Sequence, residues 1–214
     1  NASLNNWSIA GYFIGCIIAI AMGSKGVHLK YLFSMGFVLI GLSSLFMYFE
    51  VQTDGLYERM KYPVIIRSAG MMLLYSLTAV HANQRMPYKY LSTWICIMLT
   101  VRMVLGPGAG TAIYTNVMQH RQQHYVTRFA HDMDQLNTEV AASYNQTVQG
   151  MMYQGKSEKE AHNMAALSTK GRVQVQATLA AVKEMSGWTF YGCIACAVLM
   201  LVIPWRKRKL DLQT

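Results

Sequence analysis

The chain has 214 residues, of which 53% are apolar and 14% charged, and its formal net charge is +9. Soluble domains usually carry about a quarter charged residues, so this composition argues against a soluble globular protein. The positive charge does not indicate nucleic-acid binding, because four basic residues stand together in the tail "WRKRKLDLQT", directly after an apolar run. That arrangement is typical of a segment that flanks a membrane span.

Five apolar stretches are long enough to span a bilayer, which takes about 20 helical residues. They are Trp7–Met22, Tyr31–Phe49, Pro63–Ala82, Tyr90–Met118 and Trp188–Trp205. Each must be helical, because a lone strand would leave its backbone groups unpaired in lipid. The sequence therefore predicts an all-α membrane protein with about five transmembrane helices, four of them within residues 1–118 and the last in residues 188–205.

The charges of the connections predict the orientation of these helices. "GSKGVHLK" and "NQRMPYK" are short and basic, as is the tail, and basic connections face the cytoplasm. Alternating helices then deliver residues 206–214 to the cytoplasm and leave the amino end outside. The chain begins at Asn1 with no signal-peptide pattern before the first apolar run. These features imply missing upstream helices or an unusual topology, and we expect the chain to be the latter part of a longer one.

Residues 119–187 form the one long connection, which falls outside the membrane. A first apolar stripe at three- and four-residue steps consists of Met133, Leu136, Val140, Tyr144, Val148 and Met151. "QGKSEKE" interrupts it, and Ser157 with Glu160 matches a capping box. A second stripe consists of Met164, Leu167, Gly171, Val175, Leu179 and Val182. These patterns predict an extramembrane helical hairpin whose second arm leads into the last span.

Arg102 lies near the middle of the fourth apolar stretch. A guanidinium keeps its proton, and at a helix centre it costs about 2.5–3.5 kcal/mol on insertion scales. Arg102 must therefore face protein or water. It either lines a substrate or proton pathway, or pairs structurally with another helix. The five stretches carry no Asp or Glu at depth, so a carboxylate partner would come from elsewhere.

A glycine-rich run follows Arg102. Gly106, Gly108 and Gly110 allow close contact between helices, and Pro107 removes one helix hydrogen bond and permits a kink. This pattern fits static close packing, and it fits a contact that also flexes. We favour close packing with some flexing, which makes these four residues candidates for a packing or hinge site.

Metal, cofactor and enzyme sites are not predicted. Cys193 and Cys196 have the spacing of a redox or zinc pair, but they lack a second pair and a nearby histidine, so we interpret them as packing residues. His120, His124 and His131 have roughly helical spacing without a completing cysteine or acidic cluster. No nucleophile–base pair appears either, so the chain is not expected to be an enzyme.

Three stretches carry a resemblance to a known family. They are the turn and helix "GSKGVHLKYLFSMGFVLIG", the run "STWICIMLTVRMVLGPGAGTAIYTNVMQHR", and the long two-helix loop before the last span. In this order they resemble the C-terminal portion of a major facilitator superfamily transporter. More narrowly, they are similar to its fourteen-helix drug:proton antiporter branch.

The resemblance implies helices ten to fourteen of such a bundle, with the N-terminal lobe absent. It implies proton-coupled efflux of drugs or other small molecules across a bacterial inner membrane, with the C-terminus in the cytoplasm. Its implied partners are the lipid bilayer, the small-molecule substrate, protons, the missing helices and a periplasmic adaptor protein at the outer loop. An alternative from another class is a membrane-anchored sensor or interaction protein that uses the outer hairpin.

Overall fold

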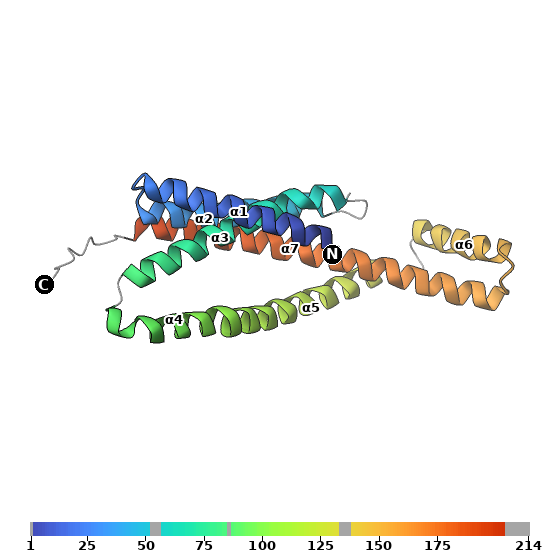
Figure 1. Cartoon of the computed structure of the whole chain (residues 1–214). Helices are drawn as coiled ribbons and strands as arrows, with labels where there is room; N and C mark the ends of the chain where they lie inside the picture. The colour runs from blue at the N-terminus through green and yellow to red at the C-terminus, as the bar shows by residue number, and fades with distance from the viewer. Residues whose placement is uncertain (1, 52–56, 85–86, 133–137, 204–214) are drawn as a thin grey trace, which may run out of the picture. The chain divides into compact units, whose positions relative to one another are not determined.

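The computed structural model describes residues 2–51, 57–84, 87–132 and 138–203 (Figure 1). The regular elements in these ranges are all helical, which confirms the predicted all-α class. Five of the described helices are long and apolar enough to cross a membrane, as predicted. The basic tail, residues 206–214, lies outside the described residues.

The first three predicted stretches correspond to α1 Ala2–Ser24, α2 Leu29–Glu50 and α3 Lys61–Gln84. Each helix extends the apolar stretch by a few polar residues, because polar ends can continue a helix beyond the hydrocarbon region. Short 3-10 turns, η1 Tyr57–Met60 and η2 Tyr88–Tyr90, precede α3 and α4.

The fourth stretch contains a break in helix type. It consists of α4 Leu91–Thr100, the π-helical turn η3 Val101–Leu105 and α5 Gly106–Asp132. Because α5 continues beyond Met118, the long connection expected from Gln119 begins as a continuation of this helix. After α6 Thr138–Tyr153, the 45-residue helix α7 Glu158–Val202 contains both the second hairpin arm and the last span.

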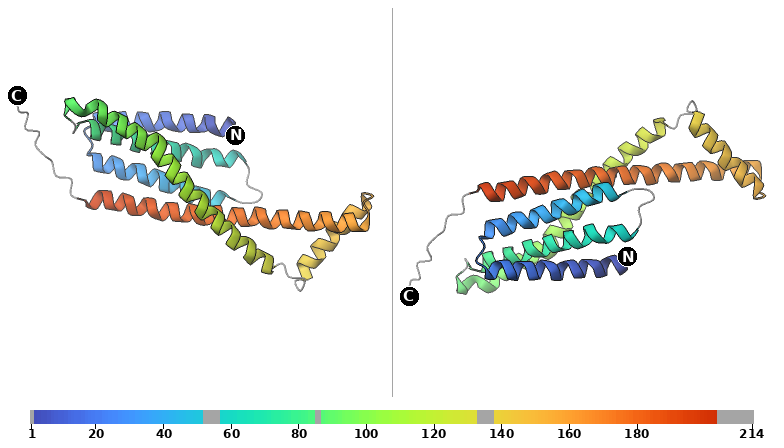
Figure 2. Two further views of the ribbon diagram at one scale, coloured as in Figure 1. Left: turned by 90° about the horizontal axis from the view of Figure 1, so that it is seen from below. Right: turned by 90° about the horizontal axis from the view of Figure 1, so that it is seen from above.

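The chain divides into two compact units. The first contains α1, α2, α3, α4 and the part of α7 from Ser186. The second contains η3, α5, α6 and α7 up to Met185. Within the first unit, α1, α3, α2 and the C-terminal part of α7 lie side by side in this order, in one layer (Figure 2).

Glycines bring α1 against α3. Gly11 and Gly15 form a G-x-x-x-G pair on α1, a pattern that lets membrane helices approach closely. A Cβ added to Gly11 would lie 2.5 Å from the Ile65 carbonyl oxygen and 2.7 Å from the Ser68 Cβ. Only hydrogen fits at this position, so the sequence of α1 fixes its contact with α3.

The other seams of the layer use small residues in the same way. A Cβ on Gly70 of α3 would lie 2.9 Å from the Gly36 carbonyl oxygen of α2. A Cβ on Gly41 of α2 would lie 3.3 Å from the Cys193 Cβ of α7. Cys193 therefore faces a helix seam, which agrees with its interpretation as a packing residue.

A buried apolar cluster fills the space between α2 and α3. It consists of Leu32, Phe33, Leu73 and Leu77, and Leu73 is fully buried. Met200 of α7 packs against its edge. Ile18, Ala19 and Met22 of α1 pack against it too, so the cluster joins four helices of the layer near one end.

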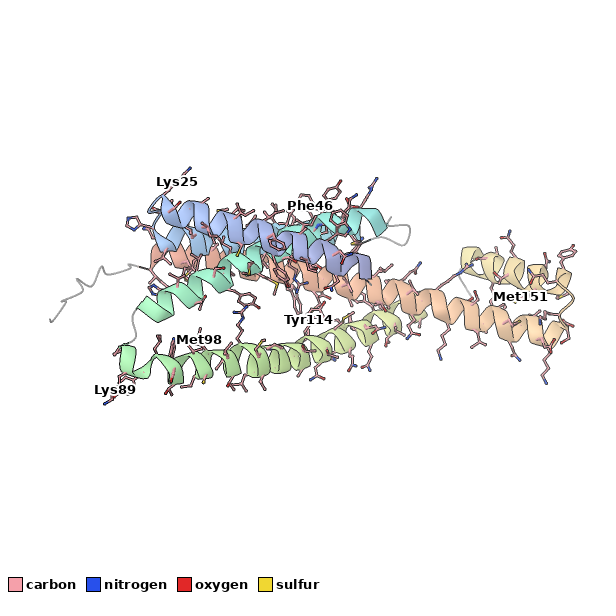
Figure 3. All side chains as sticks on the ribbon, viewed as in Figure 1. Lys25, Phe46, Lys89, Met98, Tyr114 and Met151 are labelled. Atoms are coloured by element: carbon pink, nitrogen blue, oxygen red, sulfur yellow. The ribbon has the colours of Figure 1, made fainter. Side chains whose placement is uncertain are left out.

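The helix ends of this unit follow the predicted alternation. The C-terminal ends of α1, α3 and α7 lie at one end of the layer (Figure 1), and Lys25 and Lys89 lie there too (Figure 3). The turn after α1 has Gly26 at φ +68°, and the Gly26 and Val27 N–H groups donate to the Gly23 and Met22 carbonyls at 3.1 and 3.3 Å. This is a Schellman ending, and it reverses the chain within a few residues.

The predicted hairpin is present in the second unit. A second Schellman ending closes α6 at Gly155, whose φ is +86°. The predicted capping box then begins α7: the Ser157 N–H donates to Glu160 Oε2 at 3.3 Å, and the Glu160 N–H donates to Ser157 Oγ at 3.4 Å. The interruption expected at "QGKSEKE" is therefore confirmed.

The first arm of the hairpin packs through the predicted stripe. Val148 is buried, and Tyr144 and Met151 pack against the same cluster. The Tyr144 hydroxyl also donates to the His162 carbonyl across the hairpin at 3.2 Å. Met133 and Leu136, the first members of the stripe, lie outside the described residues.

The buried face of the second arm differs from the prediction. Met164, Leu167 and Val175 are 43%, 69% and 53% exposed, and Gly171 is exposed as well. Leu179 and Val182 are only half-buried. The buried residues of this arm lie four positions apart: Ala161, Ala165, Val173, Ala177, Ala181 and Met185. Thr169, which falls in the same series, is half-buried. Alanine lets helices approach closely, so the buried face of this arm carries mostly small side chains. The predicted stripe was instead chosen from the large apolar side chains.

Candidate functional site

Arg102 lies in the π-helical turn η3. The Gly106 N–H donates to the Val101 carbonyl, five residues back, so this turn is wider than an α-helical turn. Pro107 explains the wide turn, because its ring clashes with the carbonyl four residues back and it has no N–H to donate. Single π-helical turns occur frequently at functional sites.

The residues around this turn are exposed from Val101 to Gly110. A Cβ on Gly108 or Gly110 would meet no described atom within 4 Å, and one on Gly106 would meet only the Val101 carbonyl of the preceding turn. The close contacts of the described residues lie at Gly11, Gly15 and the other layer glycines. The packing role of Gly106, Gly108 and Gly110 stays a prediction, and the helix irregularity at Pro107 is observed.

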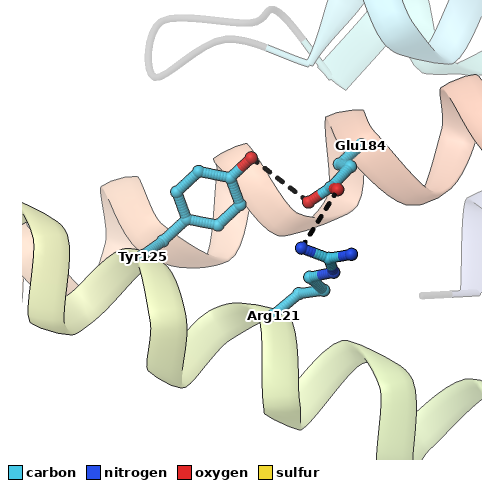
Figure 4. A network of polar contacts seen from close by, with 3 residues as sticks. All are labelled: Arg121, Tyr125 and Glu184. Carbon is cyan, nitrogen blue, oxygen red and sulfur yellow. Dashed lines mark hydrogen bonds and ion pairs between the residues drawn. The ribbon is translucent and has the colours of Figure 1, made fainter.

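A polar cluster that sequence reasoning missed joins α5 to α7 (Figure 4). Glu184 of α7 receives two groups from α5: the Tyr125 hydroxyl donates to its Oε2 at 3.2 Å, and Arg121 Nη1 lies 3.5 Å from its Oε1. Nearly two turns of α7 earlier, Thr178 Oγ1 accepts a hydrogen bond of 2.8 Å from Gln122 Nε2. We call Arg121, Gln122, Tyr125, Thr178 and Glu184 the α5–α7 clasp.

The clasp is partly shielded from solvent. The side chains of Arg121 and Glu184 are 34% and 22% exposed, so their ion pair is screened less than a fully exposed one. Glu184 lies one turn before Trp188, which begins the last apolar stretch. The clasp therefore ties α5 and α7 together where α7 changes from polar to apolar.

The two candidate regions are separate. Arg102 lies in η3 and Arg121 lies in α5, the helix that follows it. The two residues are 19 positions apart, which corresponds to about 28 Å at 1.5 Å per residue. The glycines of the 106–110 run lie next to Arg102 along the chain, and the clasp lies beyond them. Arg102 therefore lies in an irregular turn within an apolar helix, and the clasp lies nearer the C-terminal end of α5.

The sequence contains a weak signal for the clasp. Arg121, Gln122 and Tyr125 recur at three- and four-residue steps on α5, and they continue the half-buried face that includes Val117 and Met118. Nothing local indicates that their partners lie 56 to 63 positions further along the chain at Thr178 and Glu184.

Chemistry beyond these contacts has few candidates in the described part of the chain, where no group of three metal-ligating side chains comes together. The described cysteines Cys16, Cys96, Cys193 and Cys196 form no disulfide with one another. No protein-family model, curated protein or solved structure matches the chain.

Proposed function

We infer that the chain is part of a secondary active transporter, a membrane protein that exports small amphipathic or cationic molecules in exchange for protons. One observation carries this proposal: Arg102 occupies a π-helical turn directly before Pro107, within a helix apolar enough to cross a membrane. A charge and an irregular backbone at membrane depth are both tolerated where they line protein or a water-filled cavity.

A mid-membrane guanidinium costs about 2.5–3.5 kcal/mol on insertion scales, and charged residues at that depth usually serve ion or substrate pathways. A π-helical turn adds a local irregularity that a purely structural helix does not need. Both features occur within the same few residues, which supports a pathway role for Arg102 over a structural pair.

The substrate class and the coupling ion rest on the resemblance to drug:proton antiporters. In that family two lobes move around a central site, and this chain would supply the last helices of the second lobe. The seams at Gly15, Gly41 and Gly70 bring helices of the layer into close contact, with a glycine on one side of each seam. The positive-inside rule then places the Lys25 and Lys89 end, with the C-terminus, in the cytoplasm of a bacterial inner membrane.

The test is efflux of a fluorescent amphipathic cation from energised vesicles that contain the full-length transporter. We expect Arg102→Ala to lose at least about tenfold in export rate while its abundance and thermal stability stay near wild type. Arg172→Ala is the matched control, because Arg172 is an exposed arginine of the α7 hairpin arm. Full export by Arg102→Ala contradicts the proposal. An equal loss of export and of thermal stability indicates that Arg102 has a structural role.

Arg102→Lys refines the result. Lysine keeps the positive charge but loses the planar set of five donors that arginine presents. Partial export by this variant indicates that the pathway needs a charge, whereas complete loss indicates that the substrate or a carboxylate is held by paired hydrogen bonds.

A second function is favoured by the outer hairpin. Tyr153 at its tip is 92% exposed and Leu167 on its second arm is 69% exposed, so each offers a large apolar side chain to a partner. An interaction protein or sensor would use this surface, and in the transporter reading it would contact a periplasmic adaptor. Replacing Tyr153 and Leu167 by serine separates the two functions: export across a single membrane persists for a transporter, whereas partner capture is lost in either case.

A further inference from the structure

Three helices of the first unit begin next to the same dipeptide. Lys30-Tyr31 stands at the start of α2, Lys61-Tyr62 at the start of α3, and Lys89-Tyr90 at the start of α4. In each pair the lysine Nζ lies over the ring of its neighbour, at 4.9, 5.3 and 5.9 Å from the ring centroid. These distances allow a cation–π attraction. The three rings are half exposed or more, at 50%, 60% and 56%.

The lysine of the pair at the start of α3 also lies near an aromatic ring of a second helix. Lys61 Nζ also lies 5.8 Å from the ring of Trp7 on α1, so the ammonium lies near both an indole and a phenol. Trp7 is 41% exposed. At the same end, Glu50 Oε2 lies 3.7 Å from Arg59 Nη1, so the negative charge of Glu50 is paired with Arg59. The remaining ammonium protons of Lys61 can therefore be donated to an anion beside the two rings.

The spacing of these pairs matches a bilayer. Lys30 and Lys89 belong to the end of the layer where α1 and α3 finish, and Lys61 belongs to the opposite end, where α3 begins. The 24 residues of α3 span about 36 Å at 1.5 Å per residue. The hydrocarbon core is about 30 Å thick, so α3 is long enough for both of its ends, Lys61 included, to reach the depth of lipid headgroups.

We propose that these pairs bind phospholipid phosphates, with Trp7, Lys61 and Tyr62 forming a two-helix clamp at one rim and Lys30-Tyr31 and Lys89-Tyr90 forming sites at the other. The ammonium groups supply charge complementary to anionic headgroups, and the rings occupy the interfacial zone that Trp and Tyr favour. The occupant is an anionic phospholipid such as phosphatidylglycerol. This inference does not depend on the transport proposal, because it concerns the rims of the helix layer and not the helix that carries Arg102.

The experiment measures phosphatidylglycerol retained by the full chain in native mass spectrometry, after exchange from nanodiscs that also contain phosphatidylcholine. The test variant combines Lys30→Gln, Lys61→Gln and Lys89→Gln. Its matched control combines Lys156→Gln, Lys159→Gln and Lys170→Gln, which removes the same charge from the α6–α7 hairpin. A lysine near an anionic membrane surface is worth about fivefold in affinity. We expect the test variant to retain at least about tenfold less phosphatidylglycerol and the control to match wild type.

Two further sets of variants test the roles of the lysine charge and of the Trp7 ring. Lys30, Lys61 and Lys89 changed together to arginine preserve charge and ring contact, so retention should stay within about twofold of wild type. Trp7→Leu should lower retention with all lysines in place. Equal retention by the glutamine test variant and wild type overturns the proposal, no effect of Trp7→Leu overturns the clamp, and competition by inorganic phosphate in the buffer overturns lipid as the occupant.

Discussion

Adding one methyl group at Gly15 should separate α1 from α3. In Gly15→Ala the new Cβ would lie 3.0 Å from the Ala69 Cα and 3.0 Å from the Met72 Cβ, and closer still to the Ala69 carbonyl oxygen. Carbon atoms pack best at about 3.5–4.0 Å. Two of the three atoms belong to the α3 backbone, so no side chain can rotate away to make room.

The expected loss of stability follows from the difference between these distances and the preferred packing distance. Moving α1 outward by about 0.5–1 Å removes up to half of the dispersion energy of each contact along the seam, and overpacking of this kind typically costs about 1–3 kcal/mol. Alanine regains up to about 1 kcal/mol in intrinsic helix propensity. Gly23→Ala on the same helix is the matched control, because a Cβ there meets no described atom within 4 Å.

The assay is the free energy of unfolding in mixed micelles of increasing denaturing detergent, measured for both variants under identical conditions. Both substitutions gain helix propensity, so their difference isolates the steric effect. We expect Gly15→Ala to be less stable than Gly23→Ala by about 1–3 kcal/mol. A difference below about 0.5 kcal/mol, within the error of additive distant sites, would show that α1 and α3 are not held at this contact.

Two further predictions concern the second unit. In a double-mutant cycle, Arg121→Ala and Glu184→Gln should couple by about 0.5–1 kcal/mol, in the upper part of the range of exposed pairs, and a zero coupling energy would show that this ion pair does not hold α5 to α7. Cysteines placed at Lys156 and Lys209 in a background without the four native cysteines should label from opposite sides of the membrane. Labelling of both from one side would contradict the alternation of five spans.

Much of the fold follows from local patterns. The five apolar stretches and the capping box of Ser157 and Glu160 can be located because their signals lie within one segment of the chain. The Gly155 turn belongs to the same class, since a positive φ at a helix end favours glycine. These elements needed no knowledge of which helix packs against which.

The remainder depends on partners that a single sequence does not indicate. The pair Gly11 and Gly15 has a recognisable spacing, but only the structure shows that Ile65 and Ala69 of α3 lie against it. The glycines after Arg102 looked equally suited to packing. For the second hairpin arm, alanines at every fourth position were outweighed by larger apolar residues on the exposed face. Glu184 of the clasp was missed because its partners lie about 60 positions away.

The order of the layer has a consequence for biogenesis. Ribosomes deliver α1 and α2 to the membrane before α3, yet α3 lies between them in the finished layer (Figure 2). The first two helices therefore cannot complete their contacts when they leave the translocon, because both seams require the backbone of α3 at Gly70 and Ala69. The α1–α3 and α2–α3 seams therefore wait for α3, and the α2–α7 seam at Gly41 and Cys193 waits for the last helix of the chain.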